Sequence, residues 1–294
     1  MAGLRGKMLF EQLLNRVKFF KKKELETKPE VELEDIVEQV LYEIPNSEVK
    51  RPMLKTLEQT MEFLINTNSS IARFGNGEIS IIQGKNAPCQ KFDENLAKRL
   101  KEILQETNQN LAIGINREYY YPNFNKLLPD MALFFRGEVP KFRKHLSSYI
   151  RWDKEYCAAN FTQTYMFFEN YDFETHYRKL RQIWDNKKIL IVTSESAINN
   201  VLYNIYENAQ KIDYLYIPSK NAYAQYEQIY SSIKKYDTDT LIILMAGPMA
   251  KVLADDLSKE NYRALDFGYL MKDYDWYKRK KTRNWQDIVE FISR

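Results

Sequence analysis

Two glycine-containing stretches of this sequence carry charged and amide side chains in a spacing that could hold a phosphate or a cation. The first runs from Arg73 to Glu78, where Gly75 and Gly77 flank Asn76 and allow a tight, exposed turn. An amide oxygen and a carboxylate one residue apart can ligate a hard cation, and an arginine can pair with a phosphate. The same pattern is also typical of a turn with only a structural role, so both interpretations stand at this point.

The second stretch begins at Gly247 and Pro248, which open an apolar helical pattern over residues 249–257. Glycine permits a close approach of the backbone, and proline is favoured in a first helical turn. The free amides of such a helix start could hold a phosphate, and Lys251 is near enough to add a charge. An ordinary strand-to-helix turn would show the same residues.

Further polar residues follow the apolar runs of the last third of the chain. In an open parallel sheet, ligands bind beyond the carboxyl ends of the strands, so we expect these residues to converge on one edge. They are Ser194, Glu195 and Ser196 after the first run, Ser219, Lys220 and Asn221 after the second, and Asp266, Gly268 and Tyr269 at the end of the fourth.

The elements that position these residues are predicted from the hydrophobic pattern. Short apolar runs alternate with helical patterns, which indicates βαβ units and a parallel sheet. The fold class expected is therefore α/β, a mostly parallel sheet flanked by helices. The predicted strands are 189–192, 214–217, 241–245 and 264–267, and the predicted helices are 197–209, 223–233 and 249–257.

The first half of the chain is predicted in less detail. Asp93 can cap a helix whose Leu96, Leu100, Ile103 and Leu104 form one apolar stripe. Residues 54–65 are predicted to be a helix, 70–74 and 111–115 to be strands, 119–122 to begin a loop, and 124–184 to be rich in helix.

The N-terminal region differs from the rest. Apolar residues recur at helical spacing over 8–20 and three lysines follow at 21–23, which predicts a basic amphipathic helix. That helix could dock on the main body or on a second subunit, or lie on a membrane surface. Because an acidic stretch over 30–43 leads to Pro45, we place the boundary of this appendage near residue 50, with the main domain over 51–294.

Composition excludes several classes of protein. The 294 residues are enough for one large domain, and with only two cysteines and two histidines in the chain we expect no Cys/His zinc cluster. A catalytic metal would need oxygen ligands, which favours Mg²⁺ or Mn²⁺. Neither a P-loop nor a complete dinucleotide-binding fingerprint occurs.

Charge and hydropathy bear on location and partners. The net charge of +4 is too balanced for a dedicated nucleic-acid binder, although a basic cluster at 278–283 leaves a membrane- or nucleic-acid-binding module as a third interpretation. No apolar stretch approaches the roughly 20 residues of a membrane span and no signal peptide is seen, so we expect a cytoplasmic protein. It could be peripheral on the inner face of the membrane.

An ordered set of segments resembles the GT-D-type glycosyltransferases. Residues 73–78 are similar to that family's Arg-Phe-Gly-Asp-Gly-Glu motif, and the likeness spans about residues 50–277. The other similar segments are 90–93 (Gln-Lys-Phe-Asp), 134–137 (Phe-Phe-Arg-Gly), 162–164 (Thr-Gln-Thr), 191–196 (Ile-Val-Thr-Ser-Glu-Ser), 246–254 (Ala-Gly-Pro-Met-Ala-Lys-Val-Leu-Ala) and 264–268 (Ala-Leu-Asp-Phe-Gly).

The resemblance implies a Rossmann-like fold, a UDP-sugar donor, a glycan or glycoprotein acceptor in cell-surface polysaccharide or glycoprotein assembly, and a divalent metal, usually Mn²⁺. Its metal motif falls on Asn76 and Glu78, with asparagine where the family usually has aspartate. Tyr269 stands where histidine is expected. These two departures motivate an alternative, a catalytically weakened homologue that serves as a scaffold or subunit of a transferase complex.

Within the expected site each residue receives a role. Glu78, aided by Asn76, would position the metal. The diphosphate, on which negative charge develops, would be held by Arg73, by Lys251 and by the backbone amides that follow Gly247. A carboxylate must take the proton of the acceptor hydroxyl if the anomeric centre inverts, and Glu195 or Asp266 could do so. Glu195 could equally be a dipole-favoured helix start and Asp266 a strand-end turn residue. The oligomeric state stays open, with a homo-oligomer among the expectations.

Overall fold

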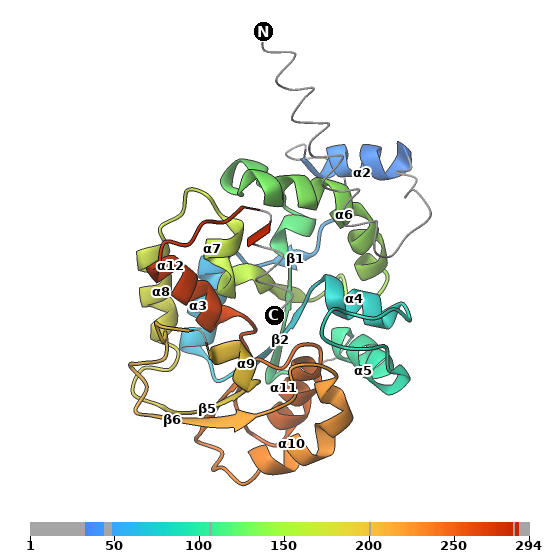
Figure 1. Ribbon diagram of the computed structural model, residues 1–294. Helices are drawn as coiled ribbons and strands as arrows, with labels where there is room; N and C mark the ends of the chain where they lie inside the picture. Colours follow the sequence, from blue (N-terminus) through green and yellow to red (C-terminus); the bar gives the residue numbers. More distant parts are fainter. Residues whose placement is uncertain (1–32, 44–48, 106–107, 200, 285, 288–294) are drawn as a thin grey trace. The chain divides into compact units, whose positions relative to one another are not determined.

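The computed structural model describes residues 33–43, 49–105, 108–199, 201–284 and 286–287 (Figure 1). By its internal contacts the chain divides into residues 1–38 and 39–294. The basic helix predicted over 8–20 lies outside the described residues. The fold given below is that of the second unit, which also contains the C-terminal part (residues 39–43) of the first described helix, α2 (Leu33–Glu43).

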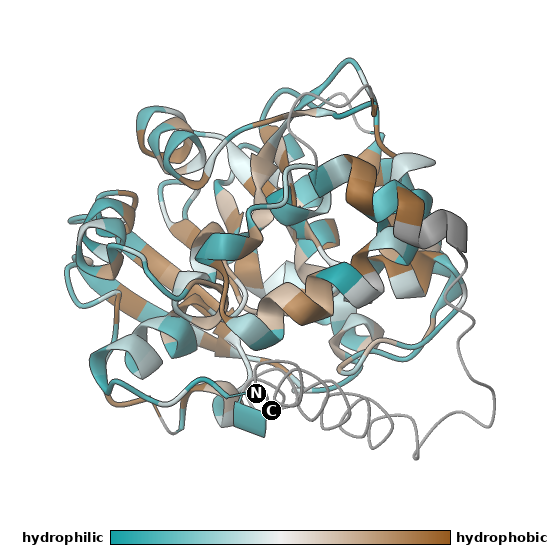
Figure 2. Cartoon of the chain, turned by 90° about the horizontal axis from the view of Figure 1, so that it is seen from above, coloured by the Kyte–Doolittle hydropathy of each residue, from teal (hydrophilic) through white to brown (hydrophobic). Residues whose placement is uncertain are grey.

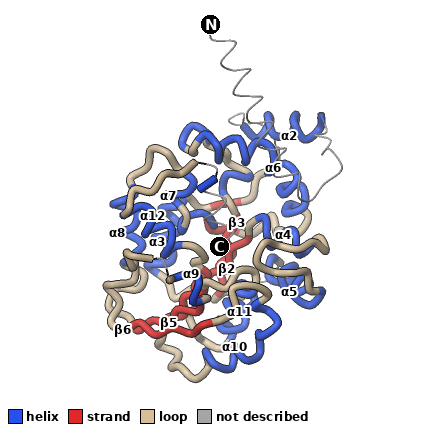
Figure 3. Tube along the Cα trace, in the orientation of Figure 1, coloured by secondary structure: helices blue, strands red, loops and turns tan. Residues whose placement is uncertain are grey.

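Eight parallel strands form one sheet, which runs through the centre of the domain (Figure 3). This confirms the α/β, Rossmann-like class and the mostly parallel sheet. The strand order is β1 (Met53–Leu54), β4 (Glu155–Ala158), β3 (Leu111–Ile115), β2 (Ser70–Phe74), β8 (Ala264–Asp266), β7 (Leu241–Leu244), β5 (Lys188–Thr193) and β6 (Lys211–Tyr216).

The central strands are buried and mostly apolar because helices cover both faces of the sheet, and the buried charged exceptions are Arg73 of β2 and Asp266 of β8. In β5, Leu190 and Val192 join the core on one face, while Ile189 and Ile191 join the core on the other. Hydrophobic residues accordingly concentrate on the strands and on the inward sides of the helices, and many outer loops are hydrophilic (Figure 2).

Each face has its own helices. The first core contains residues of α4 (Asn76–Ile82), α5 (Glu94–Leu104), α6 (Pro129–Ser147), α10 (Tyr226–Ile233) and α11 (Met249–Lys259). The second contains residues of α3 (Leu57–Asn66), α8 (Phe173–Arg181) and α12 (Leu270–Lys278). The remaining helical segments are short: α7 (Thr164–Phe167), α9 (Glu195–Ile198), η1 (Arg117–Tyr119), η2 (Phe124–Lys126), η3 (Ala159–Thr162) and η4 (Ala222–Gln225).

The chain diverges where β2 and β8 lie side by side. These strands pair at Ile71 and Leu265. After β2 the chain enters α4 on the first face, whereas after β8 it enters α12 on the second. This is the topological switch point of the sheet, and open α/β sheets bind ligands in a crevice beyond the carboxyl ends of the strands at such a point, so we expect the ligand crevice here. We call it the carboxyl-edge crevice.

The prediction of a helix over 197–209 is wrong, because among the described residues of this stretch only Glu195–Ile198 is helical. Beyond it, the buried carboxylate of Asp275 accepts hydrogen bonds from the amides of Leu202 (2.8 Å) and Tyr203 (3.1 Å). The side chain of Asn204 accepts another from the amide of Tyr206 (2.9 Å). These side-chain acceptors satisfy the backbone in a non-helical path.

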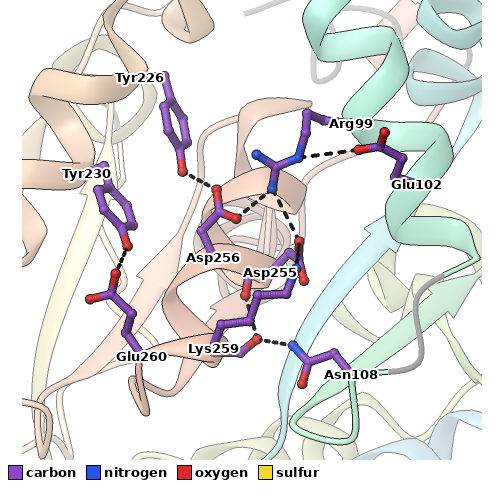
Figure 4. A network of polar contacts seen from close by, with 10 residues as sticks. Arg99, Glu102, Asn108, Tyr226, Tyr230, Asp255, Asp256, Lys259 and Glu260 are labelled. Carbon is purple, nitrogen blue, oxygen red and sulfur yellow. Dashed lines mark hydrogen bonds and ion pairs between the residues drawn. The ribbon is translucent and has the colours of Figure 1, made fainter.

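A polar network joins three helices of the first face (Figure 4). Arg99 of α5 forms ion pairs with Asp255 (3.3 Å) and Asp256 (2.6 Å) of α11. The hydroxyl of Tyr226, at the start of α10, also donates to Asp256. The network therefore ties α5 and α10 to α11.

Candidate functional site

Lys251 lies at the centre of a buried cluster of charges in the carboxyl-edge crevice. Its Nζ is 2.9 Å from Oε1 of Glu78 and 3.1 Å from Oδ2 of Asp266. It also donates a hydrogen bond to the carbonyl of Gly247 (3.2 Å). Burial alone would lower the pKa of this lysine, but the two carboxylates outweigh that effect and raise it. Lys251 is therefore a fixed cation.

Arg73 supplies the second positive charge and ties β2 to β8. Its backbone amide donates to Oδ2 of Asp266 (3.0 Å), its Nε donates to the Asp266 carbonyl (2.6 Å), and its Nη2 lies 3.5 Å from Oδ1. Its Nη1 donates to the carbonyl of Ala159 (2.7 Å) and to the hydroxyl of Thr162. The guanidinium is thus held in one orientation by two other elements, β8 and η3.

Two glycines after neighbouring strands make room for this cluster. Gly268 has a φ of +49°, and a Cβ there would lie 2.3 Å from Nη2 of Arg73. Gly247 has a φ of +54°, and a Cβ there would lie 2.9 Å from Sγ of Cys89. Since both positions combine left-handed backbone with close contact, any side chain would displace the groups beside it.

The stretch from Gly75 to Glu78, predicted to be a turn, is instead the start of helix α4. Asn76 is its first residue, and Oε2 of Glu78 accepts a hydrogen bond from the amide of Gly75 (2.9 Å). A glutamate at this position commonly bonds back to the residue that precedes the helix. The amide oxygen of Asn76 accepts a hydrogen bond from the hydroxyl of Tyr119.

Tyr269 is close to the same charges. Burial, followed by the proximity of Cys89 and Glu78, raises the pKa of its phenol to about 12. The phenol therefore stays protonated at neutral pH, where a histidine would titrate.

The other predicted residues do not join the cluster. Ser194 is buried, with its Oγ 3.2 Å from Oγ of Ser196, whereas Glu195, Ser196 and Lys220 are exposed. Within the described residues, no hydrogen bond or ion pair links these four side chains to Glu78, Lys251, Asp266 or Arg73. Pro248 is buried and directly precedes α11.

Sequence reasoning missed a buried carboxyl group beyond β3. Glu118 is 5% exposed, and its Oε2 accepts a hydrogen bond from Nδ2 of Asn160 (2.8 Å). Burial raises its pKa to about 7, against smaller opposing contributions that include Arg117 and Asn160. Oδ1 of Asn160 is itself buried without a partner. A group with this pKa can exchange a proton near neutral pH.

The expected metal can be compared with the donor atoms of this site. Both oxygens of Glu78 are engaged, one by Lys251 and one by the amide of Gly75, and the Asn76 oxygen is engaged by Tyr119. Across the described residues, no group of three or more His, Cys, Asp or Glu is placed to hold a metal ion. As arranged, the donor set does not fit a divalent cation, because the ammonium of Lys251 lies between the two carboxylates.

Fold and site together define an α/β protein with a buried cluster of charges at the switch point of its sheet, the usual place for a phosphate-bearing ligand. A family model described as the glycosyltransferase GT-D fold matches residues 71–288, and the chain belongs to this family. The resemblance seen in the sequence is thereby confirmed.

Relatives and solved structures agree with this assignment. The chain is 31% identical over 233 residues to "Probable glycosyl transferase Gly" of Streptococcus gordonii, covering 76% of this chain and 32% of that protein. It is 28% identical over 284 residues to glycosyltransferase GlyD of Streptococcus pneumoniae, covering 90% and 34%. The chain therefore spans about a third of the length of these curated relatives.

Two solved structures have the same fold. One is described as the highly conserved domain of unknown function 1792 with a distinct glycosyltransferase fold; its TM-score is 0.74 at 26% identity, covering 84% of this chain and 85% of the other. The second, a new glycosyltransferase from Streptococcus sanguinis, has a TM-score of 0.73 at 27% identity and covers 78% and 86%.

Proposed function

We propose that this protein transfers a sugar, a hexose by our expectation, from a UDP-sugar to a glycan or glycoprotein acceptor in cell-surface polysaccharide or glycoprotein assembly. Membership of the GT-D family supports the reaction class. The observation that carries the proposal is the placement of Lys251 and Arg73 at the switch point, where we expect these two cations to hold the diphosphate.

These cations suit the chemistry of sugar transfer. Breaking the bond between the anomeric carbon and the diphosphate builds negative charge on the leaving phosphate, and fixed positive charges stabilise it most strongly away from water. Lys251 and Arg73 are both less than a tenth exposed. The bond from Lys251 to the Gly247 carbonyl is its longest, so a phosphate oxygen could replace that acceptor while Glu78 and Asp266 still hold the ammonium.

A proton acceptor for the acceptor hydroxyl is also needed if the anomeric centre inverts. Asp266 is fully occupied by Arg73 and Lys251, and Glu195 is exposed at the start of α9. We add Glu118 as a third candidate, because it has a pKa of about 7 and a buried amide partner.

The divalent cation expected from the resemblance is a separate proposal. Mn²⁺ or Mg²⁺ could reach the oxygens of Glu78 and Asp266 only if Lys251 withdrew. We therefore expect UDP to raise the melting temperature of the metal-free protein, and Mn²⁺ to add little to that shift. A UDP shift seen only with Mn²⁺ would contradict this expectation and favour a metal-dependent donor site.

The proposed transfer is tested by UDP release from a panel of UDP-sugars with candidate acceptors. Glu78→Gln should lower turnover, since it weakens the hold on Lys251, while Glu62→Gln, an exposed change on α3, should leave turnover as in the parent. If the parent chain binds UDP but turns over none of the donors, the alternative of a weakened homologue acting as scaffold or subunit is favoured.

Location is likewise a proposal. None of the described helices is long and apolar enough to span a membrane. We propose a cytoplasmic enzyme that could associate with the inner membrane surface through the basic helix predicted over 8–20. Binding to anionic vesicles that survives deletion of residues 1–25 would exclude that anchor.

A further inference from the structure

A second hollow lies at the edge of the sheet where the strands begin. It has a volume of about 320 Å³. Since parallel strands all start at the same edge, it is at the opposite end of the sheet from the carboxyl-edge crevice. We call it the amino-edge pocket. Its lining includes a residue at the entry to each of five adjacent strands: Asn110 before β3, Asn68 before β2, Arg263 before β8, Asp239 before β7 and Lys187 before β5.

Two of these residues are cations without an acidic partner. The guanidinium of Arg263 donates to the carbonyl of Leu64, in the last turn of α3, and to the carbonyl of Ser69 (3.3 Å), just beyond that helix. Among the described residues, neither Arg263 nor Lys187 forms an ion pair. The negative end of the α3 dipole gives Arg263 only partial compensation.

Both cations of the pocket have lowered pKa values, as expected for positive charges withdrawn from water that form no ion pair among the described residues. Arg263 is 9% exposed, and burial lowers its pKa to about 10. Burial, followed by the charge of Arg263, also lowers the pKa of Lys187. An anion between the two groups would relieve both effects.

The one carboxylate of the lining does not supply that charge. Oδ2 of Asp239 is 3.4 Å from Nζ of Lys188, and the Asp239 side chain is 66% exposed. The Asp239 carboxylate thus pairs with Lys188, outside the pocket lining, and not with Lys187 or Arg263. The side-chain amides of Asn68 and Asn110 can add neutral donors to a bound oxyanion.

We propose that the amino-edge pocket binds a phosphate-bearing anion between Lys187 and Arg263, independently of sugar transfer at the other edge. A bound water occupies roughly 30 Å³, so this pocket has room for a phosphate and an organic group attached to it. The ligand class is therefore a phosphate monoester, with free inorganic phosphate as the smaller source of the same chemistry.

Isothermal titration of the full chain, at low ionic strength and without phosphate buffer, tests the proposal. Inorganic phosphate and glycerol phosphate are titrated in separate arms. Lys187→Gln should weaken binding about tenfold, because a charge-assisted hydrogen bond is lost. Lys211→Gln is the matched control: it removes the same charge from an exposed lysine of β6, paired with Asp213, and should leave the affinity unchanged.

Comparison of the two titrations also identifies which phosphate compound the pocket binds. Tighter binding of glycerol phosphate identifies an organic phosphate as the ligand, and equal binding identifies the phosphate group alone. Arg263→Lys keeps the positive charge but loses the planar set of donors, so it should also weaken binding. Urea unfolding is the stability control: the same midpoint as the parent shows that the loss of binding does not come from loss of the fold. No saturable binding of either probe to the parent, or equal weakening in Lys187→Gln and Lys211→Gln, would overturn the proposal.

Discussion

The ammonium of Lys251 and the carboxylate of Glu78 form a buried ion pair with an N–O distance of 2.9 Å, joining α11 to α4 across the crevice. The pair links residues 173 positions apart (251 − 78) and places the cation beside Asp266 as well. Binding and stability should therefore depend on the same side chain.

Replacement of Lys251 by methionine should abolish detectable UDP binding and lower the free energy of unfolding by about 3–5 kcal/mol, because two buried carboxylates lose their partner. The double variant Lys251→Met/Glu78→Gln should recover part of the stability but none of the binding. Lys234→Met, at an exposed ion pair with Glu260 just after α10, is the control. Calorimetric titration with UDP and urea unfolding measure the two effects, and unimpaired UDP binding by Lys251→Met would exclude a phosphate-binding role.

Gly268→Ala should displace Arg73, because the new Cβ would lie 2.3 Å from its Nη2. The strained φ adds a cost of about 1 kcal/mol or more, so UDP binding and stability should both fall. Gly84→Ala shares the positive φ but has open space around the added carbon, so it measures the backbone strain alone. Equal loss of UDP affinity in the two variants would argue against the contact with Arg73.

Glu118→Gln should change the pH dependence of stability. The folded pKa is about 7, above the ordinary value of 4.5, so between these values the folded state keeps a proton that the unfolded state releases. Stability therefore falls as pH rises through this window, by up to about 3 kcal/mol from this group. Unfolding in urea at pH 5 and pH 8 should show a smaller fall in the variant than in the parent.

The same variant discriminates among the candidate bases. If Glu118 accepts the proton, Glu118→Gln should lower kcat and remove the acidic limb of its pH profile while UDP affinity is kept. Glu195→Gln should then leave kcat unchanged. The reverse pattern would assign the proton transfer to Glu195.

Arg99→Met should destabilise the fold by about 1–2 kcal/mol, since Arg99 is partly exposed but bridges Asp255 and Asp256 of another helix. Lys98→Met, on the neighbouring position of α5, removes only an exposed pair with Glu102 at 4.0 Å and should change stability by less than about 0.5 kcal/mol. Urea unfolding compares the two, and similar values would show that the network of Figure 4 adds little.

The elements predicted well are those whose hydrophobic pattern is decided locally. Strand β2 was predicted with its observed bounds, and Asp93 caps α5 through a hydrogen bond from the amide of Leu96 (2.9 Å). Strand β4 was missed because its four residues follow a polar segment and are stabilised by pairing with strands distant in sequence.

The site was predicted only in part. Residues that follow strands of the last third were found by their position, and Arg73 and Glu78 by the motif. Glu118 follows β3 just as closely, so the same positional rule could have found it. The engagement of Glu78 by Lys251 could not be predicted, because it depends on how two helices 173 residues apart approach each other.

Strand β8 is the last strand along the described part of the chain, yet it lies between β2 and β7. Without β8, strands β1 to β4 and strands β5 to β7 form two separate half-sheets. The backbone groups of β2 and β7 that would pair with β8 then have no hydrogen-bond partner in the sheet. Asp266 belongs to this strand, so Arg73 cannot form its ion pair with Asp266 until β8 joins the two half-sheets. A chain shortened ahead of residue 264 should expose both of these strand edges and aggregate, and assembly of the ligand site should coincide with closure of the sheet.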